Sequence, residues 1–600
     1  PFAEAIFFLV TVLVSSSAGC ASLREAGLIP TLLPLLKDTN PQRIDLVISA
    51  VHILEAFMDY SHSAGTLFRD LGGLDDTIMR LQYEVTHVER RAKDERGEME
   101  VSDKDKSNVS ETGTMHMAGN NETLIPYRLR LLLKALLRAI ALGTYASGNT
   151  SRLQGSEESA LPACLCTIFA YAKEFGGGVF SLAASVMSDL INKDPTCFPT
   201  LDAAGLPTAF LDSITAEVLP SSDVVGCIPH ALDALCLSNI GMQKVLDSKA
   251  LECFVKIFTS RFYLKALSGD TPAAIASGLD ELMRHAPPLR GPGVDACINI
   301  LKRIRMIGGA DTPDTEDSDV PTPMDMDAEQ QAASNLKEEE FKTVQNESGS
   351  DIDTEAFLPE CINNTVQMLE TIFQNADTCR AFIEKQGIED LLKLFILPLL
   401  PVSFGGSPTA FNIFSTFRAF SSQHAGTLAK AVCKALKEHM KKTADSLVSM
   451  KFSDIEAESQ EKVAKNLSAA QCFLSLVTCL LRTVTLMMTE INTAGSDLFD
   501  DIGSIHRWVL WQISLVDDAK IEPSRDEESA SKSAIAIDTE GEVRDNEDEP
   551  EAAPVIRYGG GSRSRWGFES DLIPLLPTEQ HDRRTRRENM ETELWNHVAR

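Results

Sequence analysis

The amino-acid sequence predicts an all-α protein, an armadillo/HEAT-like helical repeat solenoid interrupted by acidic disordered insertions. Three observations predict this fold class: apolar residues at helical spacing, a phrase around Gly27 that recurs along the chain, and two long acidic tracts poor in apolar residues. With 600 residues, 44% of them hydrophobic, the chain is long enough for an extended array of repeats, and most of it should fold.

The first predicted block of armadillo-like repeats covers residues 1–85. Its initial run, FAEAIFFLVTVLV, has no basic region before it and is interrupted by Glu4, which argues against a signal peptide. We therefore expect a buried first helix. Because the sequence begins at Pro1 and not at a methionine, we interpret the chain as a fragment or a processed piece.

A recurring phrase carries the repeat prediction. In SLREAGLIPTLLPLL, residues 22–36, an apolar residue, a charged pair and a glycine precede a helix with paired apolar positions. We expect Arg24 and Glu25 to face solvent, and Leu32, like Leu392 in the last copy, to lie in the core. The same order recurs as TLFRDLGGLDDTIMRL at 66–81, TLDAAGLPTAFLDSI at 200–214, VLDSKALECFVKIF at 245–258 and IEKQGIEDLLKLFILPLL at 383–400.

The spacing of the phrase favours stacked repeats. Gly27 and Gly72 are 45 residues apart, and Gly205 and Lys249, in the equivalent slot, are 44 apart. Glycine suits a left-handed turn between two helices. A period near 44 is typical of armadillo and HEAT repeats, which share a continuous core because one unit cannot bury its own apolar face. The alternative is that the phrase marks any turn between helices.

Three segments are predicted to be disordered, because they hold too few large apolar residues to offset the cost of ordering the chain. Two of them are acidic: residues 311–355 contain 15 acidic and 2 basic residues, and residues 522–551 contain 12 acidic and 3 basic. The predicted domains are armadillo-like repeats at 1–85 and 124–308, a disordered insert at 86–123, acidic disordered linkers at 309–354 and 521–556, a helical repeat block at 355–520, and a tail at 557–600 that starts a next segment.

Two predicted helices carry basic stripes. The stretch 127–147 places leucines and an isoleucine on one face and Arg130, Lys134 and Arg138 on the other. The stretch 428–442 has a stripe of four lysines, for which we expect an acidic partner, the chain's own acidic tracts included. The alternative for both stripes is a solvated helix face. The four lysines of this candidate binding stripe are Lys430, Lys434, Lys437 and Lys441.

The run from Ser468 to Ile491 is predicted to be a core helix and not a membrane span, because Gln471 and Arg482 interrupt it. The 13 cysteines are scattered through apolar segments without a C-x-x-C pair. We expect them to be buried reduced thiols, which indicates a reducing compartment, cytoplasmic and/or nuclear.

Charge and motifs restrict the function further. The acidic tracts carry most of the net charge of −31, so the folded body is nearly balanced and is not a basic nucleic-acid-binding surface. We expect the tracts to act as solvating spacers or to bind basic client proteins, and we expect no direct nucleic-acid or membrane contact. The 11 histidines are dispersed, and no HExxH, EF-hand, Walker or Rossmann pattern occurs, so we assign no catalytic, cofactor or metal residue.

Long strings of the sequence resemble a known family. SAGCASLREAGLIPTLLPLLKDTNPQRIDLVISAVHILEAFMDYSHSAGTLFRDLGGLDDTIMRL and, later, DTCRAFIEKQGIEDLLKLFILPLL and LAKAVCKALKEHMKKT are similar to the N-terminal armadillo-like region of the giant HECT-type ubiquitin ligases, the plant members above all. The resemblance covers about residues 1–520. It implies a curved scaffold that gathers protein substrates, in a ligase whose C-terminal catalytic domain takes ubiquitin from a conjugating enzyme onto a cysteine.

Within this family, Thr196-Cys197-Phe198 matches the residue types around the active cysteine of the HECT domain. However, Cys197 stands between two prolines inside a repeat, so we expect no catalytic role for it. The sequence thus favours a non-catalytic, substrate-recruiting segment of such a ligase. The alternative is a stand-alone armadillo-type adaptor or transport factor without ubiquitin chemistry.

Overall fold

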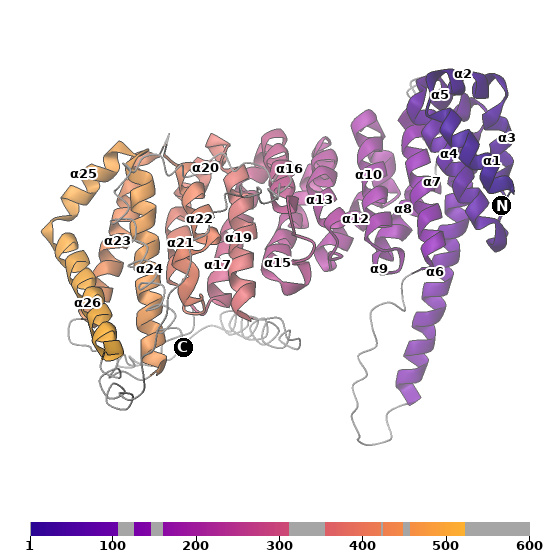
Figure 1. Cartoon of the computed structure of the whole chain (residues 1–600). Helices are drawn as coiled ribbons and strands as arrows, with labels where there is room; N and C mark the ends of the chain where they lie inside the picture. The colour runs from indigo at the N-terminus through magenta and orange to yellow at the C-terminus, as the bar shows by residue number, and fades with distance from the viewer. Residues whose placement is uncertain are drawn as a thin grey trace, which may run out of the picture. The chain divides into compact units, whose positions relative to one another are not determined.

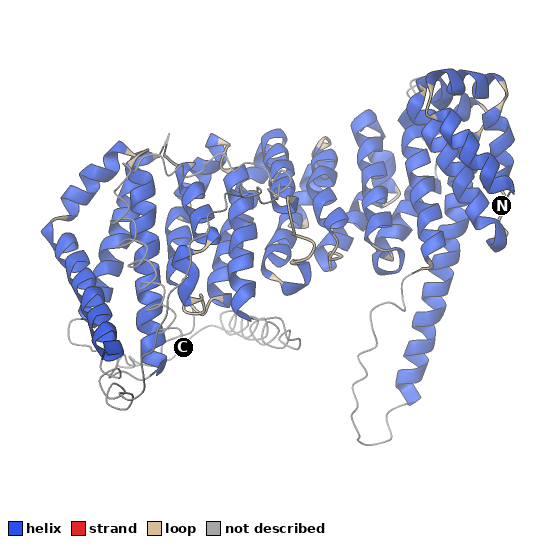
Figure 2. Ribbon diagram, viewed as in Figure 1, coloured by secondary structure: helices blue, strands red, loops and turns tan. Residues whose placement is uncertain are grey.

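The structure, a computed structural model, describes residues 2–105, 125–145, 160–310, 354–421, 424–447 and 457–521. These residues form helices and no strand (Figure 2), which confirms the predicted all-α class. The α-helices are α1 Phe2–Val14, α2 Ser17–Glu25, α3 Leu28–Leu36, α4 Ile44–Tyr60, α5 His62–Asp70, α6 Gly73–Asp105, α7 Tyr127–Tyr145, α8 Ala160–Ala170, α9 Ala172–Phe175, α10 Gly177–Lys193, α11 Phe198–Ala203, α12 Leu206–Ala216, α13 Ser222–Cys236, α14 Asn239–Asp247, α15 Cys253–Thr259, α16 Thr271–His285, α17 Arg290–Ile307, α19 Thr354–Ile372, α20 Ala376–Glu384, α21 Gly387–Lys393, α22 Pro408–Arg418, α23 Ala425–Leu447, α24 Ala457–Leu481, α25 Thr485–Ala494 and α26 Ser496–Ile521. Short 3-10 helices lie between them: η1 Pro41–Arg43, η2 Pro195–Cys197, η3 Ala250–Glu252, η4 Arg261–Tyr263, η5 Pro287–Leu289, η6 Leu394–Ile396 and η7 Val402–Gly406.

The chain divides into two compact units. The first comprises Pro1–Ala435 and Gln471–Ile491, and the second comprises Leu436–Ala470 and Asn492–Arg600. In the first unit, one row of helices packs in the order α1, α4, α7, α10, α13, α16, α19 and α22 (Figure 1). A second row pairs α3 with α6, α6 with α8, α8 with α12, α15 with α17, and α17 with α21. The two rows are the layers of a helical repeat solenoid, as predicted.

The predicted joints between helices adopt the left-handed backbone conformation. The φ angle is 75° at Gly27, 77° at Gly72 and 78° at Gly205. Lys249 keeps the same conformation, with φ of 51°, without being glycine, which confirms that it occupies the equivalent slot. In the last copy it is Gln386, and not the glycine after it, that takes the positive φ, 62°. The joint therefore requires a left-handed backbone conformation, which glycine adopts most easily but which other residues also adopt here.

Two of these joints place a glycine first in the next helix, for a steric reason. Gly73 opens α6 and Gly387 opens α21. A Cβ at Gly73 would lie 2.4 Å from the ring of Phe68, and one at Gly387 would lie 2.2 Å from the ring of Phe382. Both rings are fully buried and leave no room for a methyl group. At α12 the position that corresponds to Phe68 and Phe382 is Leu201. The helix there begins with Leu206 and not with a glycine.

The first unit stays continuous on both sides of the acidic insertion at 311–353. Helices α16 and α17, before the insertion, pack on α19, after it. The guanidinium of Arg305 lies 3.1 Å from a carboxylate oxygen of Asp390, and the amine of Lys385 lies 2.5 Å from that of Asp295. The described helices of the predicted blocks 124–308 and 355–520 therefore share one stack through α22.

The structure differs from the prediction of disorder at 86–123. Helix α6 runs on to residue 105, so disorder was wrong for residues 86–105. Val85, Val88 and Ala92 are buried at helical spacing, and the charged residues between them belong to the other faces of the helix. Composition alone missed this sparse apolar stripe. The remaining predicted disorder, at 106–123, 311–353 and 522–556, and the tail at 557–600, lie outside the described residues.

The expected burial of the first helix was also wrong. In α1, Phe8 is 73% exposed, Leu9 58% and Val12 53%, whereas Val14 is fully buried. The helix packs on α2 and α4, and it is the outermost described helix of its row. Since a solenoid helix is covered by a neighbour on each side, an outermost helix keeps an open apolar flank.

The apolar run at 468–491 forms two helices where one was expected. Helix α24 ends at Leu481 and α25 begins at Thr485. The N–H groups of Thr483 and Val484 both donate to the carbonyl of Leu480, which closes the first helix with tight turns. The expectation of a core position is confirmed in part: Leu476, Leu480 and Val484 are buried, whereas Leu486 and Met488 are 45% and 58% exposed.

The second unit contains a buried histidine. His439, on α23, is 9% exposed, and its Nε2 lies 3.0 Å from the carbonyl oxygen of Asn466 on α24. Burial lowers the pKa of His439, with a smaller contribution from the charge of Lys442. A neutral imidazole accounts both for the hydrogen bond to the Asn466 carbonyl, which it donates, and for the lowered pKa.

Candidate protein-binding surface

The candidate lysine stripe lies along α23. This helix passes from the first unit to the second after Ala435, so Lys430 and Lys434 belong to the first and Lys437 and Lys441 to the second. Lys430, Lys434 and Lys441 are exposed, as a binding stripe or a solvated face requires. An acidic partner for them stays a prediction.

Lys437 has a structural contact that the sequence did not reveal. Its Nζ donates to the carbonyl oxygen of Ala494 at 2.9 Å and lies 3.8 Å from a carboxylate oxygen of Asp497. Ala494 is the last residue of α25, where unpaired carbonyls and the helix dipole favour a cation. Lys437 therefore caps a helix, and no local pattern identifies this role because its partner is 57 residues away.

The second basic stripe, on α7, is largely engaged within the first unit. Arg138 lies 4.0 Å from Glu55 on α4, and the guanidinium of Arg130 lies 5.8 Å from the ring centre of Tyr127. The amine of Lys134 lies against the backbone at Gly178, where a Cβ would approach it to 2.2 Å. These contacts favour a packing role for the stripe.

Cys197 does not have the surroundings of a nucleophile. It ends the 3-10 helix η2 and is half-buried, with its Sγ 3.7 Å from the carbonyl oxygen of Leu190. Burial, with a smaller contribution from Asp194, raises the pKa of the Cys197 thiol to about 11. A helix N-terminus or a nearby cation can lower the pKa of a cysteine. Cys197 is the N-cap residue of the six-residue helix α11, but burial and the charge of Asp194 outweigh that effect. The thiol is therefore protonated at neutral pH.

All 13 cysteines are free thiols, and eight of them are buried while five are partly exposed. The expected burial is confirmed for the eight, and the reduced state of the thiols stays a prediction. In the described parts of the chain, no cluster of three or more His, Cys, Asp or Glu side chains is arranged to hold a metal ion.

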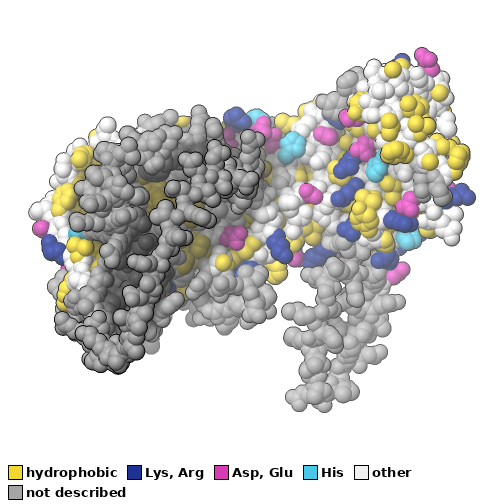
Figure 3. Space-filling model, in the orientation of Figure 1, with side chains coloured by type: hydrophobic (Ala, Val, Ile, Leu, Met, Phe, Trp, Pro, Cys, Tyr) yellow, Lys and Arg dark blue, Asp and Glu magenta, His cyan; other side chains and the backbone are white. Residues whose placement is uncertain are grey.

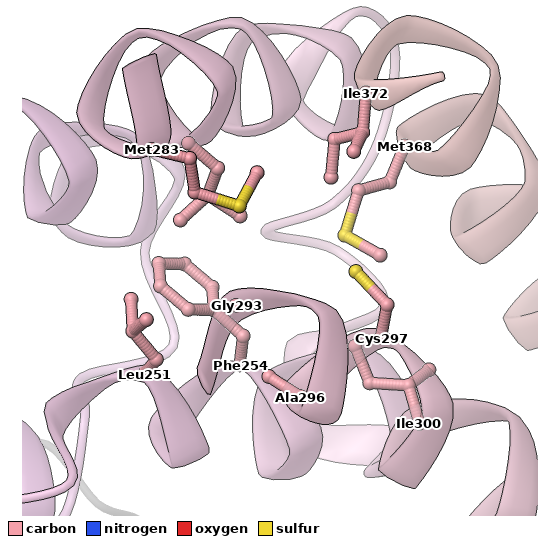
Figure 4. Close-up of a pocket in the computed structure, with 10 residues that line it drawn as sticks. Leu251, Phe254, Met283, Gly293, Ala296, Cys297, Ile300, Met368 and Ile372 are labelled. Carbon is pink, nitrogen blue, oxygen red and sulfur yellow. The ribbon is translucent and has the colours of Figure 1, made fainter. Parts of the chain in front are cut away.

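An apolar pocket lies between α15, α16, α17 and α19 (Figure 4). Its lining includes Met283, Cys297 and Met368, whose sulfur atoms border the space, and no lining side chain carries a nitrogen or oxygen. The room left for a water-sized sphere is about 10 Å³, close to the least that holds one water molecule. Burial raises the pKa of Cys297 to about 12. The pocket is a packing defect and offers no catalytic chemistry.

Apolar side chains gather on the surface over the N-terminal helices (Figure 3).

Among the described residues, the stretch Ser459–Leu481 is long and apolar enough to cross a membrane, and a bent pair, Ala5–Val14 with Ser17–Glu25, would count as a second span. Core helices pass the same test, and 56% of the apolar window in Ser459–Leu481 is buried.

Comparison with known proteins finds relatives along nearly the whole chain. It is 46% identical over 591 residues to E3 ubiquitin-protein ligase UPL1 of Arabidopsis thaliana, and equally to UPL2 of the same plant; each match covers 96% of this chain and 16% of the relative. It is 28% identical over 448 residues to E3 ubiquitin-protein ligase HUWE1 of Mus musculus, covering 67% of this chain and 10% of that protein. The chain thus spans about a sixth of the length of its plant relatives.

A solved structure of an engineered protein covers 84% of this chain at 15% identity, with a TM-score of 0.30, which is too low to indicate a shared fold. A family model described as Domain of Unknown Function (DUF913) matches residues 48–403. This stretch includes the joints at Gly72, Gly205, Lys249 and Gln386 and the helices from α4, which it enters at residue 48, to α21. The chain therefore belongs to the DUF913 family.

Proposed function

We propose that this chain is the substrate-recruiting helical scaffold of a HECT-type E3 ubiquitin ligase whose catalytic domain lies outside these 600 residues. The observation that carries the proposal is the 46% identity over 96% of the chain with two plant E3 ubiquitin-protein ligases. The fold supports it, because stacked repeats present a long surface over which several partners bind without a catalytic pocket.

A binding role also agrees with the chemistry of the thiols. HECT-type transfer needs a cysteine thiolate that accepts ubiquitin as a thioester. Cys197 is the one cysteine with a Thr-Cys-Phe context, and burial keeps its thiol protonated.

The partners that we propose are protein substrates bound here, basic clients among them, and a conjugating enzyme bound by the catalytic domain. Thirteen free cysteines support a cytoplasmic and/or nuclear location.

The second candidate is a stand-alone adaptor or transport factor of the armadillo type. The helical rows alone fit it equally well, since this fold hosts many unrelated functions. The identity with ligases favours the first candidate.

The test compares the full-length parent protein with a variant that lacks these 600 residues, in cells from which the native protein is removed. Ubiquitin-remnant mass spectrometry reports which substrate lysines lose modification. A thioester assay with the conjugating enzyme reports whether the catalytic domain still accepts ubiquitin. We expect a set of substrates to lose modification while thioester formation persists.

Two outcomes would contradict the proposal. If deletion leaves every substrate modified, the region does not recruit them. If the parent forms no ubiquitin thioester at all, the adaptor is the better interpretation. A full-length protein with Cys197→Ala is the matched control, and we expect it to behave as the wild type in both assays.

A further inference from the structure

Helix α26, in the second unit, is apolar on two faces. Its inner face buries Leu498, Ile505 and Gln512, which recur every seven residues. On other faces Phe499 is 55% exposed and Leu510 39%. These two residues are eleven apart, or about three turns, so they share a side of the helix. This side lies more than 90° around the helix axis from the buried residues. Apolar side chains of a surface helix ordinarily face a neighbouring element.

The first unit shows what happens at an acidic insertion. There the chain leaves the stack after α17, returns at α19, and repacks at once on the helices that preceded the insertion. Helix α26 is followed by a second acidic tract, 522–551, of similar composition. If the chain behaves in the same way after α26, residues beyond that tract pack on the exposed side of α26.

We propose that the exposed side of α26, formed by Phe499, Leu510 and the neighbouring Trp511, is the docking site for residues 570–600 of the same chain. The acidic tract is then a looped-out insertion, and the helical array resumes after it. This inference goes beyond the proposed function and does not depend on it.

The sequence of residues 570–600 supports this occupant. Leu572 to Pro577 reads LIPLLP, and residues 396–401, in the first unit, read ILPLLP. In that described copy Leu397 and Leu400 are 2% and 4% exposed, and the N–H of Leu399 donates to the carbonyl of Gly308 at the end of α17. The string is therefore one that this chain uses to pack against a helix of its own stack.

The end of the segment has matching shape and charge. Met590, Leu594 and Val598 recur every four residues, a spacing typical of an amphipathic helix. Arginines at 583, 584, 586 and 587 precede them. Near Phe499, α26 carries Asp497, whose side chain is 78% exposed, and the exposed Asp500. The segment thus combines apolar residues with arginines, and the exposed side of α26 combines apolar residues with carboxylates.

The connecting chain is long enough for this contact. The connecting segment, 522–569, has 48 residues, which as a random coil span roughly 35–42 Å. The 26 residues of α26 measure about 39 Å along the helix axis. A tether of this reach holds the segment at an effective concentration of about a millimolar, so a contact that would be weak between separate molecules is populated within one.

The test uses the whole 600-residue chain with the photo-reactive amino acid p-benzoylphenylalanine in place of Leu510. A matched control carries it in place of Phe262, which is 65% exposed on η4. After irradiation of an equal mixture of light and isotopically heavy chains, mass spectrometry maps the products. We expect light–light and heavy–heavy products joining position 510 to residues 570–600, and none of these from position 262.

A second variant keeps the result interpretable. Leu594→Asp should abolish the cross-links from position 510, whereas Glu593→Gln on the polar side should retain them. Products of mixed isotopic composition would assign the site to a second copy of the chain and overturn the proposal. Products that reach only the acidic tract, or no products beyond α26 itself, would overturn it as well.

Discussion

Arg305 on α17 and Asp390 on α21 form an ion pair of 3.1 Å between residues 85 positions apart, on opposite sides of the acidic insertion. Both side chains are largely buried, at 17% and 10% exposure. Lys393 lies 3.3 Å from the same carboxylate. The pair joins two helices that the sequence separates by an acidic tract poor in large apolar residues.

Removal of one member of this pair should destabilise the first unit. Arg305→Met leaves the buried Asp390 carboxylate with less compensation, and breaking a buried pair costs about 3–5 kcal/mol. Urea unfolding followed by circular dichroism, with hydrogen exchange on α17 and α21, measures the effect. The exposed pair Lys173–Glu217, at 63% and 57% exposure, is the control, and Lys173→Met should cost less than about 1 kcal/mol. Equal effects at the two sites would contradict this account.

Gly387→Ala should destabilise α21 through the ring of Phe382. The new Cβ would lie 2.2 Å from that ring, and overpacking of this kind costs about 1–3 kcal/mol. A Phe382→Leu background should reduce the additional cost of the alanine, because it makes room. Gly226 in α13 has open space around its Cβ position, so Gly226→Ala should raise stability by about 0.5–1 kcal/mol. Thermal melting of the four variants decides whether the two glycines differ in this way.

Lys437→Met should loosen the end of α25. The variant keeps most of the aliphatic chain but loses the hydrogen bond to Ala494 and its charge at the helix terminus, worth about 1 kcal/mol together. Hydrogen exchange at residues 491–495 should speed up. Lys441→Met, on an exposed turn of the same helix, should leave exchange there unchanged. If Lys441→Met has the larger effect, Lys437 is not the cap.

Stability should fall in mild acid because of His439. Burial lowers its pKa in the folded state, whereas in the unfolded chain the pKa is about 6.5. The unfolded state therefore binds a proton first, and stability present above about pH 6.5 is lost as the pH falls below it. The midpoint of urea unfolding, measured from pH 8 to pH 5, should decline less in His439→Gln than in the wild type. Parallel declines would assign the pH dependence to other groups.

The sequence predicted the fold class and the joints because both depend on local signals. Helical spacing and a glycine in a left-handed turn are visible within fifteen residues, as at Gly27. The slot of Lys249 was found by spacing alone. In contrast, the glycine at position 387 is explained by the buried ring of Phe382, and the cap at Lys437 depends on a carbonyl 57 residues away. Such contacts are absent from any local pattern.

The failures have related physical causes. Helix α6 continues past residue 85 on a stripe of only three small apolar side chains, which composition averages out. The first helix reads as buried because its residues are apolar, but exposure depends on which neighbours cover it. The candidate stripe of lysines was recognised as polar, while its division into one cap and three exposed residues required the structure.

The central claim is that this chain binds substrates without carrying ubiquitin chemistry. The most direct measurement takes substrates whose modification depends on this region and titrates each against the isolated, isotopically labelled 600-residue chain, with a parallel ubiquitin-loading reaction. The account predicts saturable binding and no thiol-sensitive ubiquitin adduct on any of the 13 cysteines. An adduct that disappears in Cys197→Ala, or no binding to any of these substrates, would contradict it.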